Sequence, residues 1–104
     1  MSINQNSGQI IPLPEAQEYV QEYRNRFPEN IKAFFVGIEK VNDIISQDNC
    51  IGIRMYNGFD TKKNKANLVL VGVDTNHKDM TDGIIVERLV TCPHTCDDSS
   101  ALNY

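Results

Sequence analysis

The residue types best suited to chemistry gather near the end of the chain, in the stretch VTCPHTC. It holds Cys92 and Cys96, two of the three cysteines, with His94 between them. Two thiolates and an imidazole are ligands that zinc takes in proteins, and a fourth would have to come from Cys50 or His77. A second pair of ligands with comparable spacing is absent from the sequence. We therefore predict no metal site.

The two neighbouring cysteines leave several interpretations open. Cys92 and Cys96 could form a disulfide, redox-active or structural, or stay free thiols in a packed terminal turn. Their spacing is not that of the Cys-x-x-Cys motif of thioredoxin-type pairs. Pro93 favours the terminal turn, because its fixed φ shapes the backbone there without a disulfide or a metal ion. A disulfide or thiol pair is thus a candidate site, and a zinc- or thiol-dependent protein is one alternative function.

A stronger candidate for a functional side chain lies mid-chain, in GIRMYNG. Arg54 and Tyr56 alternate with Ile53 and Met55, so in a strand they share the opposite face, and Gly52 leaves space beside them. An arginine with an aromatic neighbour and a gap could receive a carboxylate or a phosphate. A surface cross-strand pair, or an arginine packed over the tyrosine ring, would look the same in sequence. Arg54 and Tyr56 are our candidate ligand-binding residues.

Two further combinations are weaker. The loop DTNHKDMTDG has oxygen ligands but not EF-hand spacing, so we expect a solvated loop whose Asp74 bonds its own backbone. Cys50 with His77 could form a cysteine-hydrolase pair, but Cys50 falls at a helix-to-strand junction and not at a helix N-terminus, where its pKa would be lowered.

The sequence contains no complete set of catalytic residues. We therefore predict no catalytic residue and no cofactor, and lean away from an enzyme.

Hydrophobic periodicity predicts the elements that must position these residues. Helical spacing runs from Pro14 to about residue 27 and again over 29–47, where Gly37 indicates a close crossing by another element. Alternation from Cys50 predicts one strand, and the apolar run 68–73 predicts a second that is covered on both faces or lies near the sheet centre. Together they predict a β-hairpin. Residues 84–91 form a third candidate strand.

These elements indicate an α+β domain in which two N-terminal helices pack on a small antiparallel sheet of two to three strands. The polar residues 1–12 are expected to be a flexible arm, and 13–104 a single domain with a turn-rich C-terminal tail.

Composition limits the classes of function and the cellular location that we expect. The net charge of −4 disfavours a nucleic-acid binder, which needs a basic face. The sequence offers neither a secretory signal nor an 18-residue apolar run, so we expect a cytoplasmic protein without membrane contact.

The motifs GIR-x-Y, LVGVD and E-R-x-x-x-CP-x-x-C, in this order, resemble an uncharacterised family of short proteins from Bacteroidota. The resemblance covers nearly the whole chain and implies a single domain and a bacterial cytoplasmic setting, but no activity, cofactor or partner. The positions that match the family pattern are Gly52, Arg54, Tyr56, Asp74, Cys92, Pro93 and Cys96. His94 falls where the pattern is open, which weakens a ligand role for it.

The first functional hypothesis is a non-enzymatic binding or protein-interaction module, a homo-oligomer that uses a sheet edge or an exposed apolar strip. Another protein partner would use the same surfaces. The alternative from a different class is a small-anion or phosphorylated-ligand binder, or an enzyme, centred on Arg54.

Overall fold

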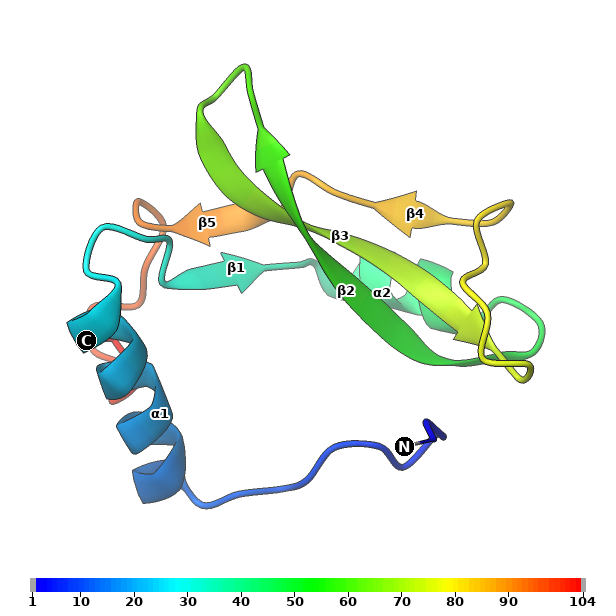
Figure 1. Cartoon of the computed structure of the whole chain (residues 1–104), viewed down its shortest axis with the longest axis horizontal. Coiled ribbons are helices and arrows are strands. Elements are labelled where there is room, and N and C mark those ends of the chain that lie inside the picture. Colours follow the sequence, from blue (N-terminus) through cyan, green and yellow to red (C-terminus); the bar gives the residue numbers. More distant parts are fainter. Residues whose placement is uncertain (1, 104) are drawn as a thin grey trace.

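The computed structural model describes residues 2–103 and has two helices and two antiparallel sheets (Figure 1). The elements are α1 (Leu13–Arg26), β1 (Ala33–Phe35), α2 (Ile38–Ile45), β2 (Cys50–Asp60), β3 (Lys65–Asp74), β4 (Ile85–Val86) and β5 (Val90–Cys92). The α+β class is confirmed. Met1 of the predicted arm and Tyr104 of the predicted domain lie outside the described residues.

The first helix follows its sequence signals closely. Pro14 occupies the first turn, where no N–H partner is needed, Glu15 lies at the positive end of the helix dipole, and Arg26 lies in the last turn. Pro28 follows the end of the helix. No residue of α1 is buried, and Figure 1 shows the helix beside the main body, with an extended N-terminal segment leading to it.

The prediction of one helix over 29–47 is wrong. Residues 33–35 form β1, which pairs with β5, and only Ile38–Ile45 is helical. Gly37 is the N-cap of α2 with an extended backbone, and no atom lies within 4 Å of where its Cβ would be, so the predicted close crossing is also wrong. Pairing with a strand nearly 60 residues away outweighed the local helical pattern. The helices consequently do not both precede the strands.

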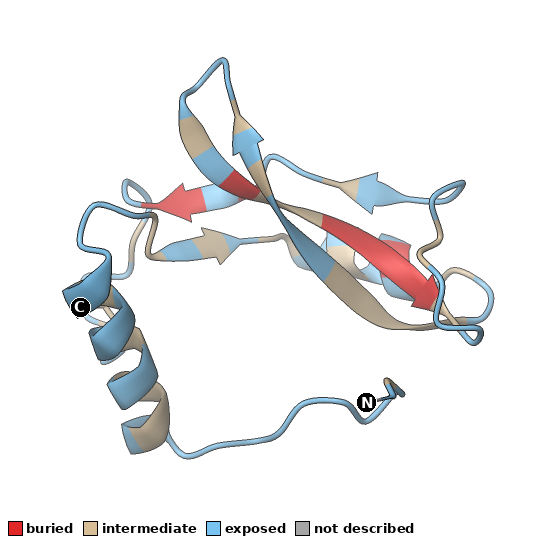
Figure 2. Cartoon of the chain, in the orientation of Figure 1, coloured by how far each residue is buried: buried red, intermediate tan, exposed pale blue. Residues whose placement is uncertain are grey.

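The predicted hairpin is confirmed. β2 pairs with β3 along nearly its whole length, around a turn at 61–64. Within β3 the four consecutive residues from Leu70 to Val73 are buried, as the apolar run predicted (Figure 2). β2 and β4 are the edge strands of this sheet, whose order is β2-β3-β4.

The third predicted strand is divided between the two sheets. Residues 85–86 pair with β3, whereas residues 90–92 pair with β1. Between them Arg88 has a φ of 61°, a left-handed conformation that breaks an extended strand. Glu87 and Arg88 interrupt the alternation of apolar and polar residues in the sequence 84–91, and the strand breaks at this point.

The hydrophobic core is small. Ile44 of α2 is fully buried against Leu70 of β3 and Leu89, and partly buried residues surround this cluster. They are Phe34, Val36, Cys50, Ile53, Leu68 and Val86. The buried residues lie in β3, in β5 with Leu89 directly before it, and at Ile44 of α2 (Figure 2).

The molecule is more extended than its length requires. Its radius of gyration is 15.3 Å, against about 13 Å for a compact domain of this length. Its accessible surface is 8081 Å², whereas a compact monomer of this mass exposes about 5,900 Å². An excess of about 2,200 Å² therefore lies open to solvent.

Candidate functional site

The two candidate side chains of β2 converge on one carboxylate. Nη1 of Arg54 donates to Oδ1 of Asp79 at 2.5 Å, and the hydroxyl of Tyr56 donates to Oδ2 of the same side chain. Arg54 and Tyr56 lie on one face of the strand because they are two residues apart. Asp79 comes from the loop after β3. We call these three residues the Asp79 clamp.

The loop is folded so that Asp79 reaches the strand. Oδ1 of Asp74 accepts the backbone N–H groups of Asn76 at 2.8 Å and Lys78 at 3.1 Å, the turn that the sequence predicted for it. The N–H of Met80 then donates to the carbonyl of Gly72 at 2.8 Å, and Asp79 forms a β-bridge with Val73. The loop is thus bound back onto β3.

The clamp stabilises the charged carboxylate. The hydrogen bond from Tyr56, followed by that from Arg54, holds the pKa of Asp79 below its ordinary value. The hydrogen bond to Asp79 raises the pKa of Tyr56 and is also the main cause of the raised pKa of Arg54. A carboxylate, a protonated phenol and a guanidinium are therefore the stable forms at neutral pH.

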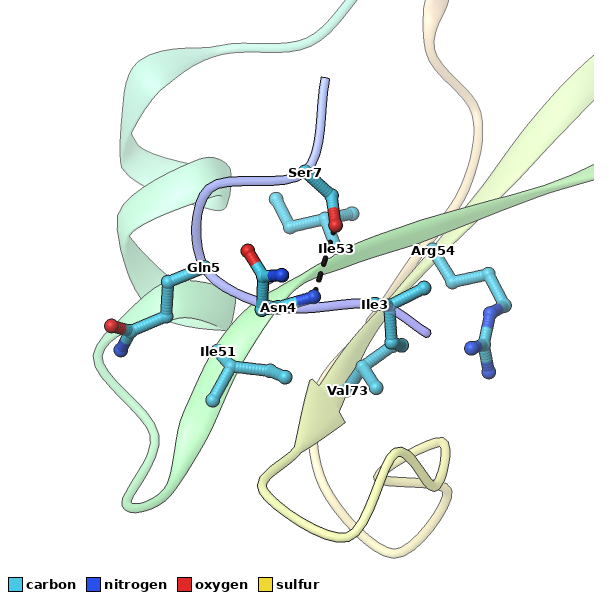
Figure 3. Close-up of a pocket in the computed structure, with 9 residues that line it drawn as sticks. Ile3, Asn4, Gln5, Ser7, Ile51, Ile53, Arg54 and Val73 are labelled. Atoms are coloured by element: carbon cyan, nitrogen blue, oxygen red, sulfur yellow. Dashed lines mark hydrogen bonds between the residues drawn. The ribbon is translucent and has the colours of Figure 1, made fainter. Parts of the chain in front are cut away.

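A pocket of about 200 Å³ lies next to the clamp, between the N-terminal residues and β2 (Figure 3). Ile3 lies beside Val73 and Arg54, while the side chains of Asn4 and Gln5 line the other side. The Arg54 guanidinium lies apart from these two amides in Figure 3, so the polar groups do not converge on a common point. This arrangement lacks the convergent polar groups of a small-ligand site.

The arginine is already matched by an internal charge. Asp79 neutralises Arg54, and its second oxygen is bound by Tyr56. A phosphate or carboxylate ligand would have to displace Asp79 or share the guanidinium with it. The Asp79 clamp can hold the loop against the sheet, and this structural role needs no ligand.

The structure joins Cys92 and Cys96 in a disulfide, with their Cα atoms 5.0 Å apart. The bond closes a short ring around Pro93 and His94 directly after β5. Both sulfurs are thereby removed from any metal site in this structure.

The remaining candidate ligands are not brought together. Within residues 2–103 no group of three His, Cys, Asp or Glu side chains could hold a metal ion. Cys50 keeps a free thiol, which donates to the carbonyl of Gly52 at 3.3 Å and not to His77.

A buried asparagine was missed by the sequence reasoning. Nδ2 of Asn67 donates to the carbonyl of Leu89 at 3.1 Å, and its Oδ1 accepts the N–H groups of Leu89 at 3.3 Å and Leu68 at 2.7 Å. Asn67 therefore fixes the segment between β4 and β5 to the side of β3. The one signal in the sequence was an asparagine directly before the apolar run 68–73 of β3, and it does not identify the distant partner.

Comparison with known proteins gives no relative. No family model, no curated protein and no solved structure matches the chain. Neither helix in the described part of the chain has the length and apolar character needed to cross a membrane.

Proposed function

We propose that the chain is a non-enzymatic interaction module that associates with further copies of itself. The observation that carries this proposal is the large accessible surface. Stable protein interfaces bury about 800 Å² on each partner, and the excess of about 2,200 Å² over a compact monomer exceeds this requirement. Burial of that surface in an oligomer would supply the stabilisation that the small core does not.

The character of the exposed surface supports the same proposal. Many large apolar side chains are exposed on the helices and strands or directly next to them, including Tyr19, Phe27, Phe35, Ile38, Met55, Phe59 and Ile85. Single exposed apolar residues are ordinary, but an excess of surface that is also apolar is typical of an interface. Another protein partner would have to use these same residues.

The anion-binding alternative ranks second. It would have to use the remaining N–H donors of Arg54, whose charge Asp79 already neutralises, and the adjoining pocket lacks convergent polar groups. A zinc-dependent function requires the free thiolates of Cys92 and Cys96, which are bonded to each other. A redox function would use this disulfide, but no further residue is assigned to it. Neither alternative is favoured by an observation as specific as the surface excess.

The proposed location is the bacterial cytoplasm, without contact to nucleic acid or membrane. The Cys92–Cys96 bond bears against this part of the proposal, because disulfides persist mainly in oxidising compartments. The interaction itself does not depend on the location, because the exposed apolar residues lie outside the disulfide ring.

Size-exclusion chromatography with light scattering tests the proposal. At micromolar concentration the expected mass is a multiple of the 11.8 kDa chain mass, and it should fall towards one chain on dilution. A mass of one chain over the whole concentration range would contradict self-association. A thermal shift with phosphate that is lost in Arg54→Ala would support the anion-binding alternative instead.

A further inference from the structure

The outer edge of β2 has no backbone partner in the described chain. β2 pairs only with β3, and no other backbone hydrogen bond reaches residues 51–60. The strand is 11 residues long and contains neither proline nor lysine, two devices that keep sheet edges from pairing. A long open edge of this kind is a template for another strand.

We propose that two copies of the chain pair through β2, antiparallel and about a two-fold axis at Asn57. This inference rests on the proposed self-association and specifies the surface that carries it. Two three-stranded sheets would then form one continuous sheet of the order β4-β3-β2-β2-β3-β4. A second copy of the chain fits this edge, because two antiparallel copies of β2 place complementary charged and apolar side chains opposite each other.

The charges of β2 select the register. Directly opposed residues of paired strands lie on the same face of the sheet, whereas neighbouring residues along a strand lie on opposite faces. When a strand pairs with its own copy about a two-fold axis, the axis must therefore pass through a residue and not between two residues. With the axis at Asn57, Arg54 faces Asp60 of the second copy. Centring on Met55 or Tyr56 instead would leave Arg54 opposite an uncharged residue.

Both charged groups have unused capacity for this contact. Arg54 has five N–H donors, and the bond to Asp79 uses Nη1 alone. Oδ1 of Asp60 accepts the N–H groups of Lys62 at 3.0 Å and Lys63 at 3.1 Å, while its Oδ2 has no partner among the described residues. The pair would therefore form without breaking the Asp79 clamp.

The same register also matches the exposed apolar side chains. Met55 and Phe59 are 63% and 62% exposed. Met55 of each copy would lie opposite Phe59 of the other, which brings a thioether against an aromatic ring. Met55 is paired with Leu70 on the core face of the sheet, so these contacts would extend the core across the axis. Tyr56 would face Gly58, which leaves room for the ring.

Single-cysteine variants test the register, in a Cys50→Ala background that removes the free thiol. Asn57→Cys places the two new sulfurs beside the axis, where opposed Cα atoms lie about 4.5–5.5 Å apart, a separation that a disulfide spans. Met55→Cys and Phe59→Cys are matched controls on the same face and edge. Each alone would lie more than about 10 Å from its own copy, since the two are offset by four residues.

Mild oxidation should give at least about tenfold more covalent dimer from Asn57→Cys than from either control alone. Mixing the Met55→Cys and Phe59→Cys proteins should restore cross-linking, which keeps the test valid if Asn57→Cys fails to fold. Equal yields from all variants, or none from Asn57→Cys and from the mixture while light scattering shows a dimer, would overturn the β2 interface and leave self-association standing. A single-chain mass for the unmodified protein would overturn both.

Discussion

Asp79 binds two side chains of the neighbouring strand, and its ionisation should determine when this contact stabilises the fold. Its pKa in the folded chain is lowered, so the contribution is present above the unfolded value near 3.9 and is lost as pH falls through the lowered value. In Asp79→Asn the urea midpoint should lie below that of the unmodified protein at pH 7. The two midpoints should approach each other as the pH falls below about 3.9, and a constant gap would contradict the role of the charge.

Tyrosine absorbance gives a second readout of the same contact. The raised pKa of Tyr56 predicts that one tyrosine ionises above the ordinary value near 10, and that Asp79→Asn returns it towards that value. Tyr56→Phe is the control, since it should remove the late-titrating component altogether.

Asn67 is the second residue whose role depends on a distant backbone. Asn67→Ala leaves both the N–H and the carbonyl of Leu89 without their partner in a buried site, which should lower the free energy of unfolding by about 1–3 kcal/mol. Urea denaturation measures the change. Asn76→Ala, in an exposed loop, is the control and should stay within about 0.5 kcal/mol. Equal losses would contradict the assignment.

At the scale of elements, α2 stabilises the main sheet through one side chain. Ile44→Ala removes a side chain with 0% exposure from the core, which should cost about 2–5 kcal/mol. Ile45→Ala, on the next and half-exposed position of the same helix, should cost much less. Chemical denaturation of both variants checks this, and similar losses would mean that α2 does not contact the core as described.

The elements also divide into those that the sequence predicted and those that it did not. The first helix and the hairpin were predicted because proline, glycine and alternation act locally. β1 was not, because Phe34 and Phe35 also fit a helical stripe and only pairing with 90–92 makes them extended. The same limit applies to the site. Alternation predicted that Arg54 and Tyr56 share a face, but the loop conformation decided which carboxylate they meet.

At the scale of the whole molecule, the proposed self-association would account for both the small core and the large accessible surface. A chain of this size that buries few side chains and leaves a long strand edge unpaired would gain stability by pairing that edge, as we propose. Dimerisation through β2 would join two small cores by a continuous sheet. The Asp79 clamp would then keep Arg54 oriented beside the interface.

Residue-resolved amide hydrogen exchange of the unmodified protein tests this account most directly. In an edge strand only alternate amides are bonded to the neighbour, whereas a strand paired on both sides protects consecutive amides. We predict protection at consecutive residues over 54–60 of β2 at high protein concentration, with every second amide losing protection on dilution. Protection of alternate amides alone, unchanged with concentration, would contradict pairing through β2.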